Sequence, residues 1–339
     1  MANIFWDKID ASLKYCKHKM IWHAYGFPKI GDLEHTCFHD APISDPWDVD
    51  QKMAVSVAIT GSFFRHEENP NQPVTDNTIR ESAREVLAAG ASTVHIHVRD
   101  HHQHNILSCE QFHNVIAPLK EEFPGLAVDG CLVPGLSRDW DEMKKTIDTK
   151  ILDAAPVNST AVFIGDSVLA KPPAILIEKT RMIQEAGGVP EIAVYNDADI
   201  SNADRYLLRS GLMGPGAMWL ILPALPGCSP MENPKQMVEG VTRMVNTIRD
   251  VDPQAFIMVC AAGRASMHLA TLAASLGLHI RIGMEDTYYM WPHRDDRINS
   301  NLQCFELAMQ LSEVVGRPIM TRQEYRDRLL ATAAAPKAA

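Results

Sequence analysis

The sequence lacks the signatures of several protein classes. It has no run of about 18 apolar residues, the length that a membrane-spanning helix requires, and residues 1–19 lack the apolar core of a signal peptide. Acidic residues outnumber basic ones by 42 to 32. This excess disfavours a nucleic-acid surface, which needs clustered Lys and Arg. We therefore expect a cytoplasmic protein that binds neither membranes nor nucleic acids.

Paired cysteines are also missing. The seven cysteines are dispersed and none forms a Cys-x-x-Cys pair, so we expect reduced thiols and no disulfides. The Gly-x-Gly-x-x-Gly fingerprint of dinucleotide-binding folds does not occur. The remaining composition is ordinary for a globular protein, with 46% hydrophobic and 22% charged residues in a chain of 339. These values exclude a disordered chain.

Short apolar runs alternate with amphipathic segments from about residue 53 onward. Thr75 and Asp76 have the character of a helix N-terminus, and Gly90 ends the pattern that follows. Several apolar runs are continuous aliphatic blocks, which is typical of strands covered on both faces. Eight runs are candidate strands: 54–60, 93–99, 126–133, 152–158, 191–196, 218–225, 255–262 and 279–285. The alternation predicts an α/β protein with a (β/α)8 TIM barrel, and a doubly wound open sheet is the alternative.

Residues 1–50 do not fit this repeat. They are rich in aromatic residues, among them Phe5, Trp6 and Trp22, so we interpret them as an N-terminal arm that packs on the barrel or on a neighbouring subunit. The catalytic barrel is predicted over 51–330, and the Ala-rich end, 331–339, as a frayed tail.

The strongest functional signal lies in the second predicted strand, at Val94-His95-Ile96-His97-Val98-Arg99-Asp100. Side chains alternate faces along a strand, so His95, His97 and Arg99 share the face that points into the barrel. They stand at the C-terminal end of the strand, where barrel enzymes place their active sites. Two imidazoles in this arrangement favour a shared metal ion. The alternative is that both histidines satisfy backbone groups in the core.

The last predicted strand carries the second signal, at Arg281-Ile282-Gly283-Met284-Glu285-Asp286. Alternation places Arg281 and Glu285 on the inward face, with Gly283 leaving room between them. Strand eight lies two positions from strand two in a closed barrel, so Glu285 can join His95 and His97 in a ligand set with an open position. The alternative is a buried Arg281–Glu285 ion pair, which alone is weakly stabilising. Asp286, just past the strand, is the candidate general base.

Other strand-end residues are candidate substrate contacts. Thr60 and Gly61 end the first strand, where backbone N–H groups can meet an anion. Cys131 lies in the third strand and can equally be a small core residue. Asn158 ends the fourth strand, and Arg264 opens a helix after the seventh, a natural position for a phosphate of coenzyme A.

Several short motifs follow one another along residues 53–330. They are A-I-T-G in the first strand, N-x-P-V-T before the first helix, A-G-A-x-x-V-H-I-H-V-R-D in the second strand, P-E-I-A-V-Y in the fifth, L-P-G in the sixth, G-R in the seventh, H-I-R-I-G-M-E-D in the eighth, and G-R-P-I-M-T near residue 316. Through these motifs the chain resembles the β-keto acid cleavage enzyme family.

The resemblance implies an activity. Family members move an acyl group between a β-keto acid and acetyl-CoA, which gives acetoacetate and a new acyl-CoA. The zinc ion of the family would stand on His95, His97 and Glu285, where it polarises the keto oxygen and holds the substrate carboxylate. Asp286 would move the proton, while Arg281 orients it and helps to hold negative charge. A homo-oligomer, dimer or tetramer, is also implied.

Some residues depart from the family pattern. Phe63 stands where one family member has a glutamate that meets the ammonium group of its substrate, so we expect a neutral or apolar substrate tail. Arg65 and His66 are the features that could instead favour an anionic tail. Further departures lie on strands three to five: Cys131 for a serine, Pro156 for a threonine, and Ala193 and Asn196 where acidic residues are common.

Two other functions fit the same residues less well. A metal-dependent aldolase or lyase on this barrel would need no acyl acceptor, so it would turn over without acetyl-CoA. A non-catalytic barrel would lose stability without its metal but would consume no keto acid. The metal itself is left open, because two imidazoles and one carboxylate suit several divalent ions besides Zn²⁺.

Overall fold

The computed structural model describes residues 3–16, 38–40, 46–134, 137–225 and 233–334. The chain divides into two units, Met1–Asp48 and Val49–Ala339. The first unit contains helix α1 (Trp6–Cys16) and an antiparallel bridge between Ile4 and His39. Trp22 of the predicted arm, and Pro226 and Gly227 of the L-P-G motif, lie outside the described residues.

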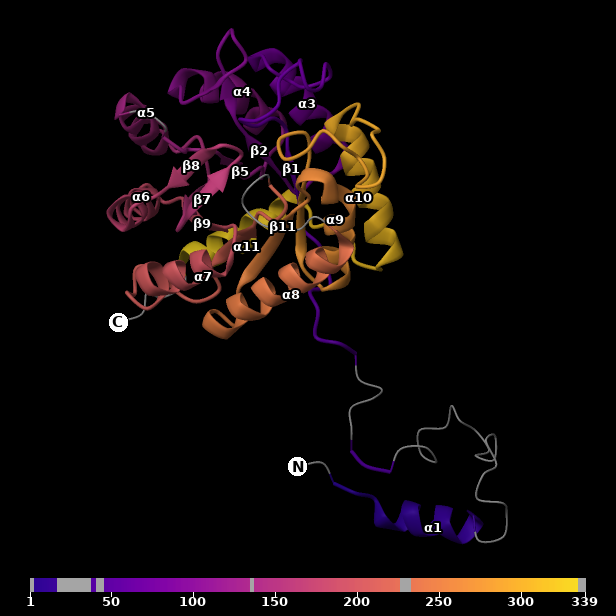
Figure 1. The fold of residues 1–339 in the computed structure, drawn as a ribbon. Helices are drawn as coiled ribbons and strands as arrows, with labels where there is room; N and C mark the ends of the chain where they lie inside the picture. The colour runs from indigo at the N-terminus through magenta and orange to yellow at the C-terminus, as the bar shows by residue number, and fades with distance from the viewer. Residues whose placement is uncertain (1–2, 17–37, 41–45, 135–136, 226–232, 335–339) are drawn as a thin grey trace. The chain divides into compact units, whose positions relative to one another are not determined.

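A closed barrel of eight parallel strands forms the centre of the second unit (Figure 1). Each strand overlaps one of the eight predicted runs, so the predicted barrel is confirmed. In order around the barrel the strands are β1 (Val55–Ala58), β2 (Thr93–Ile96), β5 (Val128–Gly130), β6 (Ala154–Asn158), β9 (Val189–Val194), β10 (Met218–Ile221), β11 (Phe256–Cys260) and β12 (His279–Ile282), and β12 pairs with β1.

Helices follow the strands and cover the outside of the barrel (Figure 1). Thr75 caps the first of them by accepting a hydrogen bond from the backbone N–H of Thr78, and Gly90 ends it with a positive φ of 111°. The helices are α3 (Asp76–Ala89), α4 (Cys109–Glu122), α5 (Ser137–Asp148), α6 (Pro173–Glu185), α7 (Asp197–Ala203), α8 (Pro234–Val251), α9 (Ser266–Ser275) and α10 (Asn301–Val314).

Strand alternation divides the apolar core into two layers. Outward side chains such as Val57 and Ile192 pack against the helices, whereas inward ones such as Leu220 and Met258 fill the barrel. A further helix, α11 (Arg322–Ala334), places Tyr325 in the inner layer. Its arginines bond carbonyl groups just before β5 and β10, so α11 closes the N-terminal end of the barrel. Its last residues fall in the segment predicted to be frayed.

Two hairpins interrupt the barrel repeat and correct the predicted strand ends. Barrel pairing stops at Ile96, and the chain then forms β3 (Val98–Arg99), which pairs antiparallel with β4 (Asn105–Ile106). After β6, strand β7 (Ala161–Ile164) pairs antiparallel with β8 (Ser167–Ala170). The predicted strand 93–99 was therefore too long, because Val98 and Arg99 pair within their own hairpin.

None of the helices in the described ranges is long and apolar enough to cross a bilayer. Cys109, Cys131, Cys260 and Cys304 are free thiols.

Candidate metal centre

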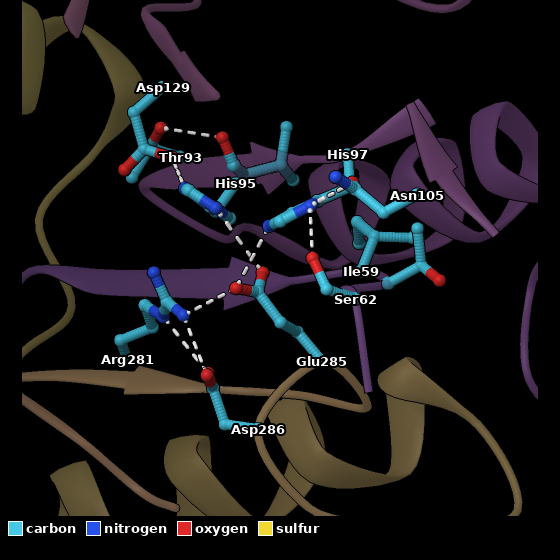
Figure 2. Close-up of polar contacts among 12 residues, drawn as sticks. Ile59, Ser62, Thr93, His95, His97, Asn105, Asp129, Arg281, Glu285 and Asp286 are labelled. Atoms are coloured by element: carbon cyan, nitrogen blue, oxygen red, sulfur yellow. Dashed lines mark hydrogen bonds and ion pairs between the residues drawn. The ribbon is translucent and has the colours of Figure 1, made fainter. Parts of the chain in front are cut away.

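His95, His97 and Glu285 converge inside the barrel at the C-terminal ends of its strands (Figure 2). Nε2 of His95 lies 3.3 Å from Oε2 of Glu285, and Nε2 of His97 lies 3.1 Å from Oε1. All three residues are buried, and one donor atom from each lies within 4.8 Å of the others. The structure thus brings together the three residues that sequence reasoning selected as metal ligands.

The donor atoms suit a divalent cation. Nε2 of His95 and Oε2 of Glu285 are buried and have no hydrogen-bond partner among the described residues. Buried polar atoms without partners are rare in folded proteins, and a cation between these two would satisfy both. Two imidazole nitrogens and one carboxylate also leave a coordination position for substrate, as in catalytic zinc sites.

The electrostatics of the site favour positive charge. Burial opposes charging of His95, but the Asp129 and Glu285 carboxylates outweigh it and raise its pKa well above the usual value. Burial likewise opposes charging of His97, and neighbouring Cys131 and Glu285 raise its pKa to about 10. The surroundings therefore draw two protons onto the imidazoles. A divalent cation brings the same charge and leaves both rings neutral for ligation.

Polar side chains hold both imidazoles by their Nδ1 atoms. Asp129 on β5 is hydrogen-bonded to Nδ1 of His95, and Oδ1 of Asn105 lies 2.6 Å from Nδ1 of His97 (Figure 2). Each contact leaves Nε2 free to face Glu285, which is how carboxylates orient metal-binding histidines. Sequence reasoning missed both partners. Asp129 could have been found, because alternation places it on the inward face with Cys131. No local signal marks Asn105, which reaches His97 only through the hairpin.

Arg281 joins the two carboxylates at the end of β12 (Figure 2). Its Nη2 lies 2.8 Å from Oε1 of Glu285 and 2.7 Å from Oδ1 of Asp286, and its Nε lies 3.0 Å from Oδ2 of Asp286. Burial disfavours the charges of Glu285 and Arg281, but their attraction to neighbouring opposite charges holds the pKa of Glu285 below its usual range and raises that of Arg281. The Arg281–Glu285 ion pair, which was the alternative interpretation of these residues, is therefore present. The Glu285 carboxylate of this pair also faces the two imidazoles.

Two glycines permit this arrangement, each for a reason that the sequence did not reveal. A Cβ on Gly61 would lie 2.2 Å from Cγ of Glu285, so Gly61 makes room for the carboxylate side chain. A Cβ on Gly283 would lie 2.2 Å from the carbonyl oxygen of Ala58. Gly283 was predicted to leave room between Arg281 and Glu285. Those two side chains form an ion pair, and the glycine also allows β12 to approach β1 closely.

A cavity of about 700 Å³ opens beside Asp286. Arg264 lies on its rim, where the guanidinium carbon is 3.4 Å from the centroid of the Tyr289 ring and Nη2 is 2.7 Å from Oδ1 of Asp295. Phe64 and Leu225 also line this cavity. The cavity is large enough for part of an extended cofactor-sized ligand.

A second cavity, of about 430 Å³, is apolar. Phe63 and Phe64 form one wall, and the β7–β8 hairpin supplies Val168 and Leu169 to the other. None of the described residues that line it is charged. Phe64 and Leu225 border both cavities, so the two spaces adjoin.

Arg65 and His66 are turned to other partners. Nη2 of Arg65 lies 3.2 Å from Oε2 of Glu67, and Nε2 of His66 lies 3.0 Å from the carbonyl oxygen of Gln72. These two cationic candidates are thus engaged within their own loop.

The remaining predicted substrate contacts lie at different distances from the centre. Thr60 is buried and its hydroxyl accepts a hydrogen bond from Gln72. Asn158 is buried, with Nδ2 3.4 Å from the Tyr195 hydroxyl. Asn196 caps α7 by accepting from the backbone N–H of Asp199. A direct contact of Thr60, Gly61 or Asn158 with substrate stays a prediction.

Cys131 follows β5, and the strand register sets it opposite His97. Burial opposes ionisation of the thiol, but the neighbouring imidazoles of His97 and His95 outweigh it and lower the pKa of Cys131 to about 5.

Comparison with known proteins gives a family match for most of the chain. The model of the beta-keto acid cleavage enzyme family matches residues 52–330. The chain is 25% identical over 279 residues to the 3-keto-5-aminohexanoate cleavage enzyme of Acetoanaerobium sticklandii, covering 82% of this chain and 98% of that protein. It is also 25% identical to the 3-oxoadipate:acetyl-CoA acetyltransferase of Cupriavidus necator, covering 82% of this chain and 95% of that protein.

Among solved structures, ObcA without ligand superposes with a TM-score of 0.63 at 18% identity. The match covers 77% of this chain and 65% of ObcA, so the chain spans about two thirds of that structure. This likeness concerns the fold.

Proposed function

Because the chain belongs to the beta-keto acid cleavage enzyme family, we propose that it is a zinc-dependent acyltransferase that condenses a β-keto acid with acetyl-CoA and yields acetoacetate and a new acyl-CoA. The observation that carries the proposal is the convergence of His95, His97 and Glu285 beside the Arg281–Asp286 pair. The printed names of the relatives support the reaction class, since one is a cleavage enzyme for a keto acid and another an acetyl-CoA acetyltransferase.

The proposed ligands of the zinc ion are His95, His97 and Glu285, which offer two imidazole nitrogens and a carboxylate. When bound, the ion supplies Lewis acidity, which polarises a keto oxygen and stabilises the negative charge that develops on it. Asp129 and Asn105 hold the imidazoles so that Nε2 of each points at the shared space.

Asp286 is proposed to move the proton. Its carboxylate lies between Arg281 and the larger cavity, which it lines. Two hydrogen bonds from Arg281 fix its orientation, so that one oxygen can accept a proton from a substrate in the cavity. The same guanidinium contacts Glu285, so it also supplies positive charge where an oxyanion would form.

The larger cavity is proposed to receive acetyl-CoA. It opens beside Asp286, and Arg264 on its rim is suited to a phosphate of the coenzyme. The ring of Tyr289 beneath Arg264 holds the guanidinium in place.

The apolar cavity is proposed to receive the tail of the β-keto acid. Phe63 lies in its wall, and none of the described lining residues carries a charge. A charged tail would lose hydration there without a partner. The structure thus supports a neutral or apolar tail over an anionic one, since Arg65 and His66 are engaged elsewhere.

The protein is further proposed to act in the cytoplasm as a homo-oligomer. Within the first unit, Trp6 and Leu13 of α1 are 63% and 56% exposed, and apolar side chains on one helix favour association with another surface.

A substrate panel tests the proposed reaction. Purified protein is incubated with β-keto acids of matched length and neutral, anionic or cationic tails, with and without acetyl-CoA, and acetoacetate is measured. Acetoacetate should form only with acetyl-CoA, and fastest with the neutral tail. Cleavage that continues without acetyl-CoA would instead identify a lyase, and absence of turnover across the panel would overturn the proposal.

A further inference from the structure

Cys131 occupies the position next to both imidazoles of the proposed metal centre. Strand β5 pairs with β2 at Ile96 and Gly130, and the backbone N–H of Cys131 donates to the carbonyl of Ile96 at 3.1 Å. This pairing continues the register of the two strands by one residue and sets Cys131 opposite His97, as Asp129 is opposite His95. Strand alternation turns Cys131 to the same inward face as Asp129.

A thiol on the inward face beside a metal-binding imidazole is placed to reach the ion that the imidazole holds. Zinc–nitrogen and zinc–sulfur bonds measure about 2.0–2.1 and 2.3 Å, so the sulfur must come about as close to the ion as the imidazole nitrogens do. The buried, unpartnered Nε2 of His95 and Oε2 of Glu285 face the same space, which independently marks it as the place of a ligand.

The strand order places Cys131 on the side that the other donors leave open. Glu285 follows β12, the imidazoles belong to β2, and β5 lies on the far side of β2 from β1 and β12. The thiol of Cys131 lies outside the group formed by the donor atoms of the other three residues, so ligation requires the thiol to turn toward them.

We propose that Cys131 is a fourth ligand of the resting metal ion, so that two imidazoles, one carboxylate and one thiolate close the coordination sphere until substrate arrives. The inference rests on the metal centre of the proposed function. Ligation would form a metal–sulfur bond and release the thiol proton to solvent. Substrate binding would break that bond as a substrate oxygen takes its place, the displaced thiolate would regain a proton from solvent, and no electron would be transferred.

The sulfur donor has two chemical consequences. A soft thiolate favours Zn²⁺ and Co²⁺ over Mn²⁺ and Mg²⁺. A site of two imidazoles and one carboxylate accepts several divalent ions, and ligation by Cys131 would restrict it to fewer of them. A closed coordination sphere also keeps water off the metal when no substrate is bound.

Cobalt substitution tests this assignment without an activity measurement. Full-length protein is loaded with Co²⁺ and its spectrum recorded for the wild type, Cys131→Ser and Cys260→Ser. Serine changes the volume little and removes the sulfur. Cys260 is the matched control, because it is another inward-facing thiol of the barrel but lies on β11, which β12 and β1 separate from β2.

The proposal predicts a near-ultraviolet sulfur-to-cobalt charge-transfer band in the wild type and in Cys260→Ser, and its loss in Cys131→Ser. Visible ligand-field bands should persist in all three. Zinc affinity of Cys131→Ser should fall by at least the roughly 10–100-fold typical of an outer-shell partner, and manganese affinity by less.

The possible failures are distinguishable. Ligand-field bands without the charge-transfer band in the wild type would overturn the role of Cys131 and leave the metal centre in place. A charge-transfer band that survives in Cys131→Ser would overturn it as well. Absence of all cobalt bands would reject the metal centre itself, and with it the proposed function.

Discussion

Asp129 on β5 is hydrogen-bonded to Nδ1 of His95 on β2, and the two residues are direct neighbours in the register of these strands. The contact fixes the imidazole so that its Nε2 lies 3.3 Å from Oε2 of Glu285. Asp129, the carboxylate that orients the metal-binding histidine, therefore comes from the neighbouring strand. Glu285, the carboxylate on the other side of the imidazole, comes from the end of β12.

Replacing Asp129 by Asn should weaken metal binding. The amide keeps the shape of the side chain but lacks the negative charge that makes His95 a stronger donor, so zinc affinity should fall about 10–100-fold. Competition with a chelator measures this. Asp166→Asn, at an exposed position between β7 and β8, is the control, and an unchanged affinity in Asp129→Asn would show that the contact does not support the metal.

Replacing Phe63 by Glu should redirect the choice of substrate. A carboxylate in the wall of the apolar cavity would provide a counter-charge for a cationic tail and a desolvation cost for an apolar one. We expect kcat/KM to shift by roughly 10–200-fold in favour of the cationic substrate. Phe163→Glu, 61% exposed in β7 and not among the residues that line the cavity, should leave the preference unchanged. Equal behaviour of the two variants would place the substrate tail elsewhere.

Replacing Arg264 by Ala should raise KM for acetyl-CoA about tenfold with little change in kcat, because a phosphate contact remote from the reacting atoms contributes to ground state and transition state alike. Steady-state kinetics with acetyl-CoA varied at a saturating β-keto acid measure both constants. Arg243→Ala removes another exposed arginine, which is paired with Asp197 on the outside of the barrel. A similar KM in both variants would argue against a coenzyme contact at Arg264.

Glu191 should make stability depend on pH. It faces the barrel interior from β9, and burial, with a smaller contribution from Asp129, raises its pKa from 4.5 to about 8. Because the pKa of Glu191 is higher in the folded state, its protonated carboxyl contributes stability that is complete below the pKa of the unfolded chain. That stability is lost as the pH rises through about 8. Between about pH 5 and 8 the unfolding free energy of metal-free Glu191→Gln should fall less than that of the wild type, by on the order of a few kcal/mol.

Urea unfolding at constant ionic strength measures that difference. Glu185→Gln, at an exposed position near the end of α6, should follow the wild type. Parallel curves for Glu191→Gln and wild type would show that Glu191 ionises as readily in the folded chain as in the unfolded one.

The barrel and the meeting of three donors could be predicted because both depend on local pattern and strand order. Alternation turns His95 and His97 inward, and a closed barrel brings the end of strand eight near strand two. The Asp129 contact needed the register between β2 and β5, which no local pattern fixes. The apolar cavity depends on the β7–β8 hairpin. Its two strands pair with each other outside the barrel, so the repeating barrel pattern does not predict them. The fit of Gly61 against Glu285 arises only when β1 and β12 lie side by side.

The most direct test combines metal content and product formation in the same preparations. Wild type, chelator-stripped wild type, zinc-reconstituted wild type and Glu285→Gln are each assayed for bound metal and for acetoacetate made from a neutral β-keto acid and acetyl-CoA. The account predicts that metal and acetoacetate formation are lost together on stripping and in Glu285→Gln, and that both return on reconstitution. Acetoacetate formation at the wild-type rate by metal-free protein would contradict it.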